Sequence, residues 1–181
     1  MSERKPFLQP EDYLEPICPF CDPTGGQVRQ IPVDRVLRKL DEYIDKNDVE
    51  GADRHLAYWL EEAKEGRDEG GMLTLLNERM GLMRNAGRHG EAVKYAEEAL
   101  ALVEKMGIPD EVVAGTTYLN AGTVYNAAGD AAKALPLYER AEKIYGANLG
   151  EGDSRIGGLY NNMAVTCMHL GIFERAEECY N

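Results

Sequence analysis

The residues with the clearest capacity for chemistry lie near the start of the chain, where two residues separate Cys18 from Cys21. Two thiolates at this spacing can supply half of the four ligands of a structural zinc site. No second cysteine pair follows at the usual distance, so a zinc ion would need further ligands from the fold or from another chain. The alternative is that both thiols are free or pack against the first helices. A redox role needs a βαβ context, which the sequence lacks, and we expect no other cofactor.

Motifs for catalysis are absent from the sequence. It contains no Gly-rich phosphate loop ending in Lys-Ser or Lys-Thr, no His-Glu-x-x-His and no Gly-x-Ser-x-Gly. Paired glutamates such as Glu61-Glu62 and Glu97-Glu98 fall on predicted exposed helix faces, whereas a catalytic carboxylate pair needs a cleft that shifts its pKa. We therefore expect no enzymatic activity in this region.

Composition narrows the range of partners. Asp and Glu number 32 against 20 Lys and Arg, which gives a net charge of −12. Such a surface repels phosphate backbones, so we expect no nucleic-acid partner, and a basic or neutral protein is favoured unless the charge serves solubility alone. We expect no membrane span and no signal peptide. Four cysteines in 181 residues do not suggest a secreted disulfide scaffold, so a cytoplasmic location is expected.

The elements that would position any binding residues are revealed by an internal repeat. Gly87, Gly129 and Gly171 are spaced 42 residues apart, and an alanine follows each glycine five residues later. Apolar residues at helical spacing precede each glycine, which suits the left-handed residue that ends a helix. A second helix is predicted to follow, with Asp130 as one N-cap. Each unit is thus an antiparallel helix pair that needs its neighbours to bury its apolar face.

A weaker unit precedes these three, and a proline-rich segment precedes that unit. Asn47 stands in the place of the repeat glycine, a substitution that the left-handed conformation tolerates. Pro136 falls inside a predicted helix and is expected to remove a backbone hydrogen bond there. The predicted organisation is an irregular extension over 1–32 and a repeat array over 33–181, with units at about 33–66, 72–106, 114–148 and 156–181. The last unit is incomplete, so we expect the native protein to continue or another subunit to cover this end.

One stretch resembles a known repeat family closely. Leu149 to Ala164 reads LGEGDSRIGGLYNNMA, and Gly171, Phe173, Ala176 and Tyr180 follow at the family's spacing. This pattern resembles the tetratricopeptide repeat in its long, 42-residue form, as in kinesin light chains. The resemblance covers about residues 33–181 and implies an all-α fold, an α-solenoid of antiparallel helix pairs wound into a right-handed superhelix. It also implies a scaffold that binds a protein or peptide on its concave face.

The resemblance places the first helix of every pair on that concave face. The candidate peptide-binding residues are Thr74, Asn77, Glu78, Arg84, Asn85, Thr116, Asn120, Thr123, Asn126, Asn161, Asn162, Val165 and His169. Asparagine both donates and accepts, so Asn120 and Asn162, one repeat apart, could clamp a peptide main chain. The alternative is that these two residues only join neighbouring helices. Leu119 and Glu78 depart from the family pattern, since each replaces an asparagine.

Other interpretations of the array are also compatible with the sequence. A clamp for chaperone tails is not expected, because Asn77, Gly81 and Gly158 stand where that clamp needs Lys, Asn and Lys. The chain could also be a self-associating structural module, and therefore a homo-oligomer. It could be the regulatory or sensor part of a longer protein whose effector domain lies beyond residue 181.

Overall fold

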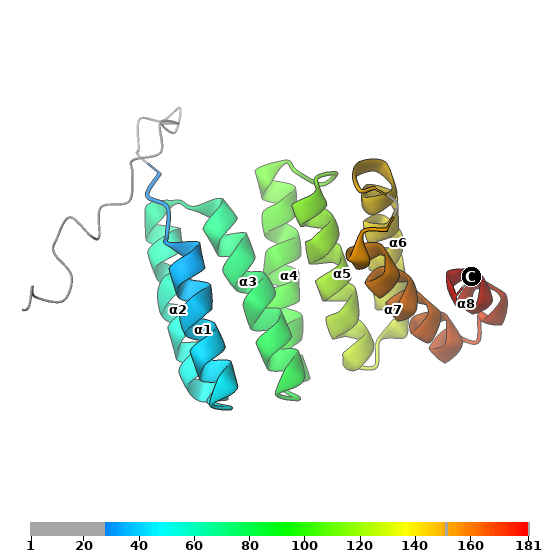
Figure 1. Cartoon of the computed structure of the whole chain (residues 1–181), viewed down its shortest axis with the longest axis horizontal. Coiled ribbons are helices and arrows are strands. Elements are labelled where there is room, and N and C mark those ends of the chain that lie inside the picture. The colour runs from blue at the N-terminus through cyan, green and yellow to red at the C-terminus, as the bar shows by residue number, and fades with distance from the viewer. Residues whose placement is uncertain (1–27, 151, 181) are drawn as a thin grey trace, which may run out of the picture. The chain divides into compact units, whose positions relative to one another are not determined.

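The computed structural model describes residues 28–150 and 152–180, and helices joined by short connections make up these ranges (Figure 1). Eight α-helices and no strands occur in this part of the chain, which confirms the all-α prediction. The helices are α1 (Val33–Asp45), α2 (Val49–Gly66), α3 (Glu69–Asn85), α4 (His89–Met106), α5 (Val112–Ala127), α6 (Ala131–Asn148), α7 (Ser154–Leu170) and α8 (Phe173–Tyr180). Cys18 and Cys21 lie outside the described residues. The chain forms two compact units, one up to Thr74 and one from Leu75, and the division falls within α3.

The first unit holds the α1–α2 pair. Val36 and Leu40 of α1 and Leu56 and Leu60 of α2 are buried, and the two helices contact each other. The turn between them uses Asn47 at φ 54°, in the left-handed conformation expected where an asparagine replaces the repeat glycine. The first unit is therefore a helix pair of the predicted kind.

A short segment, residues 29–31, is hydrogen-bonded to the C-terminal end of α2 and to the residues that follow it. The amide of Arg29 donates to the carbonyl of Gly66 across 2.8 Å, and the amide of Ile31 donates to Asp68 across 2.9 Å. A side chain on Gly66 would collide with the Arg29 carbonyl, so the close approach requires glycine there. Residues 29–31 are thereby fixed to the end of α2.

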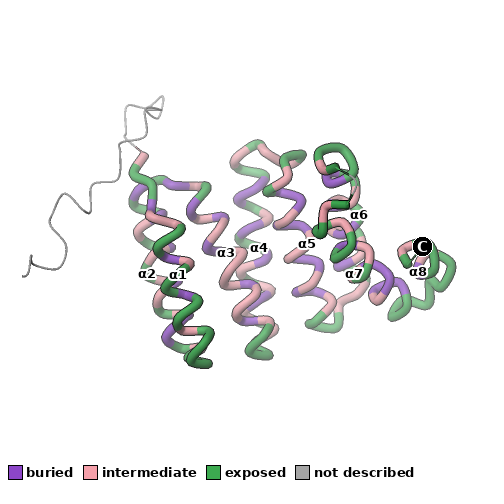
Figure 2. The backbone as a smooth tube through the Cα atoms, in the orientation of Figure 1, coloured by how far each residue is buried: buried purple, intermediate pink, exposed green. Residues whose placement is uncertain are grey.

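Consecutive helices pack against one another in the second unit, as Figure 1 shows, with contacts from α4 to α5, α5 to α6, α6 to α7 and α7 to α8. Gly87, Gly129 and Gly171 have φ of 72°, 85° and 75°, so they end α3, α5 and α7 in the left-handed conformation, as predicted. Buried residues recur along the facing sides of these helices (Figure 2). α6 continues through Pro136 as one helix, and Pro136 is exposed.

The α5–α6 pair packs closely because glycine faces tyrosine at two levels. A Cβ on Gly122 would lie 2.7 Å from Cε1 of Tyr138, and a Cβ on Gly115 would lie 2.8 Å from Cε1 of Tyr145. Both tyrosines are buried, at 0% and 1% exposed. The two glycines are seven residues apart, as are the two tyrosines, so both contacts fit one antiparallel register. Each ring thus occupies space that any larger residue on α5 would need.

Candidate functional site

The predicted binding residues all lie on α3, α5 and α7, the first helices of their pairs. Those on α5 and α7 come together, because α5 contacts α7 directly within the second unit. Among the described helices of that unit, the second helices approach one another less closely: neither the α4–α6 pair nor the α6–α8 pair contacts as extensively as α5 and α7 do. The first helices are therefore closer to one another than the second helices are.

Asn77 is the centre of a hydrogen-bond network between α3 and α5. Its Nδ2 donates to Oγ1 of Thr117 across 3.0 Å, and its Oδ1 accepts from Nδ2 of Asn120 across 2.8 Å. Thr117 is fully buried and also donates to the carbonyl of Val113. This network matches the alternative left open above, in which Asn120 joins neighbouring helices.

The next repeat lacks the same network. Leu119 stands where the preceding repeat has Asn77, and Leu159 stands where it has Thr117. For Asn162, the counterpart of Asn120, the position that corresponds to Asn77 is therefore a leucine, which offers no amide acceptor. Neither Asn162 nor the exposed Asn161 has a side-chain hydrogen bond to the residues that the structure describes. Two amides on α7 are thus available to other groups.

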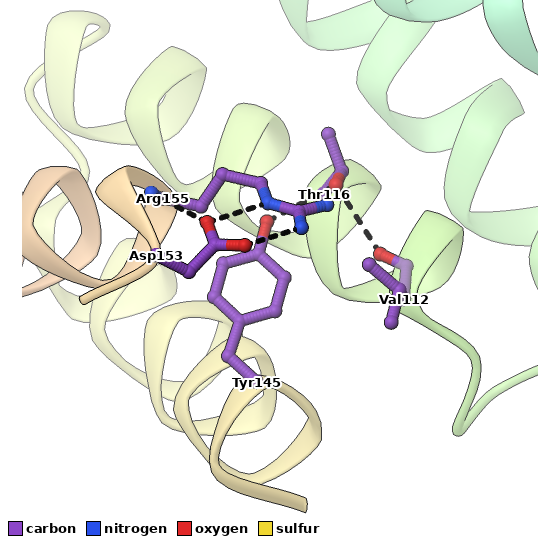
Figure 3. Close-up of polar contacts among 5 residues, drawn as sticks. All are labelled: Val112, Thr116, Tyr145, Asp153 and Arg155. Atoms are coloured by element: carbon purple, nitrogen blue, oxygen red, sulfur yellow. Dashed lines mark hydrogen bonds and ion pairs between the residues drawn. The ribbon is translucent and has the colours of Figure 1, made fainter. Parts of the chain in front are cut away.

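The threonines of α5 are already bonded within the fold. Thr116 donates to the carbonyl of Val112 across 3.2 Å and lies 3.1 Å from the hydroxyl of Tyr145 (Figure 3). Thr123 donates to the carbonyl of Leu119 across 2.9 Å and accepts from Tyr138 across 3.4 Å. Burial raises the pKa of both tyrosines, so their hydroxyls stay protonated at neutral pH. These threonines hold α6 against α5.

A charged cluster fixes the start of α7 (Figure 3). Asp153 caps the helix by accepting from the amide of Arg155 across 3.0 Å, and the Arg155 guanidinium donates to the same carboxylate across 2.6 Å. These hydrogen bonds from Arg155 lower the pKa of Asp153 to about 2. The guanidinium also lies 5.9 Å from the Tyr145 ring centroid. The loop into α7 is thereby tied to the end of α6.

A pocket lies where α5 and α7 end and α6 begins. Its volume is about 340 Å³, and its lining residues are Asn126, Gly129, Asp130, Ala131, Ala132, His169 and Leu170. Nδ1 of His169 donates to Oδ1 of Asn126 across 3.3 Å. Asn126 and His169 were predicted as binding residues, whereas Asp130 was predicted only as a helix cap, so the pocket itself was missed.

The α3 candidates show a different environment. Arg84 donates to Oδ1 of Asn85 across 3.0 Å, so these neighbours are paired with each other. Asn77 and Glu78 both have interaction partners. Arg79, which was not predicted, lies over the ring of Tyr95 at 4.1 Å. Side chains on this helix are therefore more engaged than the asparagines on α7.

No group of three His, Cys, Asp or Glu side chains that could hold a metal ion occurs within residues 28–150 and 152–180. Cys167 is buried and Cys179 half-buried, and both are free thiols. Burial is the main cause that raises the pKa of each thiol, so both are protonated at neutral pH. Across the same ranges, no helix is long and apolar enough to cross a membrane.

Comparison with known families identifies the central part of this array. The family model of the tetratricopeptide repeat matches residues 71–147. Residues 71–147 are tetratricopeptide repeats. No curated protein matches the sequence. The tetratricopeptide fold in general serves as a scaffold for protein interaction.

Several solved structures share the fold at low sequence identity. BtubC (BKLC) from P. vanneervenii is 22% identical with a TM-score of 0.71, and the match covers 83% of this chain and 62% of BtubC. Nearly identical TPR-like repeats assigned to a kinesin light chain of Podosopora anserina are 21% identical with a TM-score of 0.73, covering 83% and 74%. A STAND protein of Pyrococcus horikoshii with a tetratricopeptide repeat sensor is 21% identical with a TM-score of 0.55, covering 81% and 22%. The chain thus spans under two thirds of BtubC and of the STAND protein.

Proposed function

We propose that this tetratricopeptide array holds an extended segment of a partner protein against the face formed by α5 and α7, without catalysing a reaction. The observation that carries the proposal is the unpaired amide of Asn162. An extended peptide presents one backbone donor and one acceptor at almost every residue, and an asparagine side chain can satisfy both. The side-chain amide of Asn162 has no hydrogen-bond partner among the described residues, because Leu119 stands at the position that corresponds to Asn77. The amide of Asn120, in contrast, already donates to Asn77.

The position of this face supports peptide binding. In a curved stack of helix pairs, the helices on the inner side approach one another most closely. The direct contact between α5 and α7 therefore favours an inner, concave position for them. A concave face surrounds an extended chain on more than one side, which is how repeat arrays commonly present a binding surface.

The charge distribution supports a site that reads the peptide main chain. α5 contains no Asp, Glu, Lys or Arg, and Arg155, the lone arginine of α7, is paired with Asp153. Exposed glutamates lie on the second helices instead, at Glu97, Glu98 and Glu139. These three carboxylates thus belong to helices other than α5 and α7, on which asparagine amides remain.

The test uses a displayed library of random dodecapeptides selected on the full chain. Sequences enriched on the wild type are then measured against Asn162→Ala, which should bind about tenfold more weakly because an amide lost from a buried main-chain contact costs roughly 1–2 kcal/mol. Asn162→Ala should unfold within about 0.5 kcal/mol of the wild type, since it breaks no hydrogen bond in the described fold.

A matched control is available on a second helix. Asn148, the last residue of α6, donates to the carbonyl of Ile144 across 2.8 Å and belongs to neither α5 nor α7. Asn148→Ala should leave the affinity for the selected peptides unchanged. Equal binding by the wild type and Asn162→Ala would move the site away from α7 and refute the proposal.

Self-association is a second candidate, favoured by the exposure of large apolar side chains on α7 and α8. Phe173 is 66% exposed, Tyr180 58% and Met168 52%. Apolar side chains gathered on one surface commonly mark a contact with another protein. Sedimentation over a range of concentrations should then show a dimer that Phe173→Ser weakens, and a constant monomer mass would exclude this candidate.

A further inference from the structure

The pocket between the ends of α5 and α7 and the start of α6 has a distinctive charge pattern. Its seven lining residues include one carboxylate, that of Asp130, and no lysine or arginine. Two of them, Asn126 and His169, are also candidate residues of the proposed peptide-binding face. The pocket therefore opens at one end of that face.

Helix ends add to the field in the pocket. Asn126 lies in the last turn of α5, and His169 and Leu170 are the final residues of α7, so two C-terminal ends face this space. Each C-terminus carries about half a negative charge, whereas the start of α6, with Ala131, contributes about half a positive charge. Together with the full charge of Asp130, which the largely solvent-exposed ammonium of Lys133 offsets only in part, the negative groups prevail. An anion is disfavoured here and a cation is favoured.

The carboxylate of Asp130 is accessible to a competing cation. Its Oδ1 caps α6 by accepting from the amide of Lys133 across 3.1 Å, and its Oδ2 pairs with Nζ of Lys133 at 3.1 Å. The Lys133 side chain is 65% exposed. An ion pair so open to water is weak and readily exchanged, so an incoming cation can replace it at Oδ2 while the cap remains.

The remaining lining suits a long basic side chain. Nδ1 of His169 must donate in its bond to Oδ1 of Asn126, because an amide oxygen cannot donate. In the neutral ring, Nε2 is then left as an acceptor. Leu170, Ala131 and Ala132 offer apolar surface for methylene groups. A volume of about 340 Å³ leaves room for such a stem together with its charged head.

From these observations we infer that this pocket is a subsite for a lysine or arginine side chain of the bound peptide, with Asp130 as its charge partner. The inference rests on the proposed function for the peptide, but the pocket can be tested without a peptide. The net charge of −12 assists by drawing basic segments to the protein. Asp130 thereby adds selection for a basic residue to a face that otherwise contacts the main chain.

The test is a backbone-amide NMR titration of the full chain with Nα-acetyl-lysine methylamide and with its norleucine analogue. The lysine compound should shift the amides of Gly129, Ala131, Ala132 and His169 and bind about threefold to fivefold more tightly than the norleucine compound, the range an exposed ion pair supplies. Asp130→Asn should abolish this preference. An asparagine keeps the cap, so α6 should remain intact.

Asp48→Asn is the matched control, because Asp48 caps α2 in the same way and lies in the other unit. It removes one negative charge and should leave the lysine preference unchanged. Equal binding of the lysine and norleucine compounds, or a lysine preference that survives Asp130→Asn, would overturn the inference. Failure of the proposed function gives a different result: no peptide depends on Asn162, while lysine-specific shifts at the pocket persist.

Discussion

Asn120 donates to Asn77 across 2.8 Å although the two residues are 43 positions apart, one more than the 42-residue repeat. His169 and Asn126 are separated by the same 43 positions and are also hydrogen-bonded. Both bonds join the first helix of one repeat to the first helix of the next. Neighbouring first helices are therefore displaced by one residue, so chemically equivalent positions do not face each other.

The network at Asn77 yields a test by double substitution. Asn77→Leu leaves the amide of Asn120 without its acceptor and removes the hydrogen bond that Oγ1 of Thr117 accepts, and should lower the free energy of unfolding by about 1–2 kcal/mol. Adding Thr117→Val removes the buried hydroxyl and moves the pair towards the Leu119–Leu159 combination of the next repeat. Urea unfolding of both single variants and the double variant should therefore show a favourable coupling of about 1 kcal/mol. Additive losses would show that the hydrogen bond is energetically unimportant.

Gly115 and Gly157 occupy the same repeat position and should respond to alanine in opposite directions. A Cβ on Gly115 would lie 2.8 Å from Tyr145, while nothing lies within 4 Å of a Cβ on Gly157. Gly115→Ala should cost about 1–3 kcal/mol, since a buried ring must move. Gly157→Ala should stabilise by about 0.4–1 kcal/mol through the lower entropy of the unfolded chain. Urea unfolding measures both, and shifts of the same sign would contradict the glycine–tyrosine packing.

Asp153 gives a prediction about pH. Its pKa of about 2 lies below the ordinary 3.8 because Arg155 donates to its charged form. A depressed pKa contributes stability above the ordinary value, and this contribution is lost as the pH falls through the folded value. Arg155→Gln should return the pKa of Asp153 towards 3.8, and the stability difference between the two proteins should vanish between about pH 4 and pH 2.

Carbon-detected NMR titration of the Asp153 carboxyl group follows this change directly. Asp130 serves as an internal reference, since its pKa is lowered by Lys133 and not by Arg155. Its titration should be the same in both proteins. If the pKa of Asp153 were the same in Arg155→Gln as in the wild type, the start of α7, and not the Arg155 side chain, would be the cause of the low value.

The helix ends could be predicted from the sequence because they depend on local properties. Gly129 needs a left-handed conformation and Asp130 caps the next helix, and both roles follow from the residue type and its neighbours. The packing of Gly115 on Tyr145 was missed for the opposite reason. It depends on the register between two helices, which glycine and tyrosine do not specify by themselves.

The candidate site was only partly predictable for a related reason. The 42-residue period suggested that Asn120 and Asn162 act as equivalent members of one ladder. Asn120 instead pairs with Asn77, 43 residues earlier, and the residue 43 positions before Asn162 is Leu119, which has no amide. The pocket at Asp130 was also missed, because it forms from three helix ends that are distant in sequence.

Leu119→Asn tests this account of Asn162 most directly. The substitution supplies, one repeat later, the amide that Asn77 supplies to Asn120, so Asn162 should acquire an internal partner. The affinity for peptides selected on the wild type should then fall about threefold to tenfold, because binding must first break a hydrogen bond worth roughly 1 kcal/mol. Leu119→Ala is the control: it loses the same apolar contact without offering an amide. If Leu119→Ala weakened peptide binding as much as Leu119→Asn, the leucine itself, and not the freedom of Asn162, would be what the peptide requires.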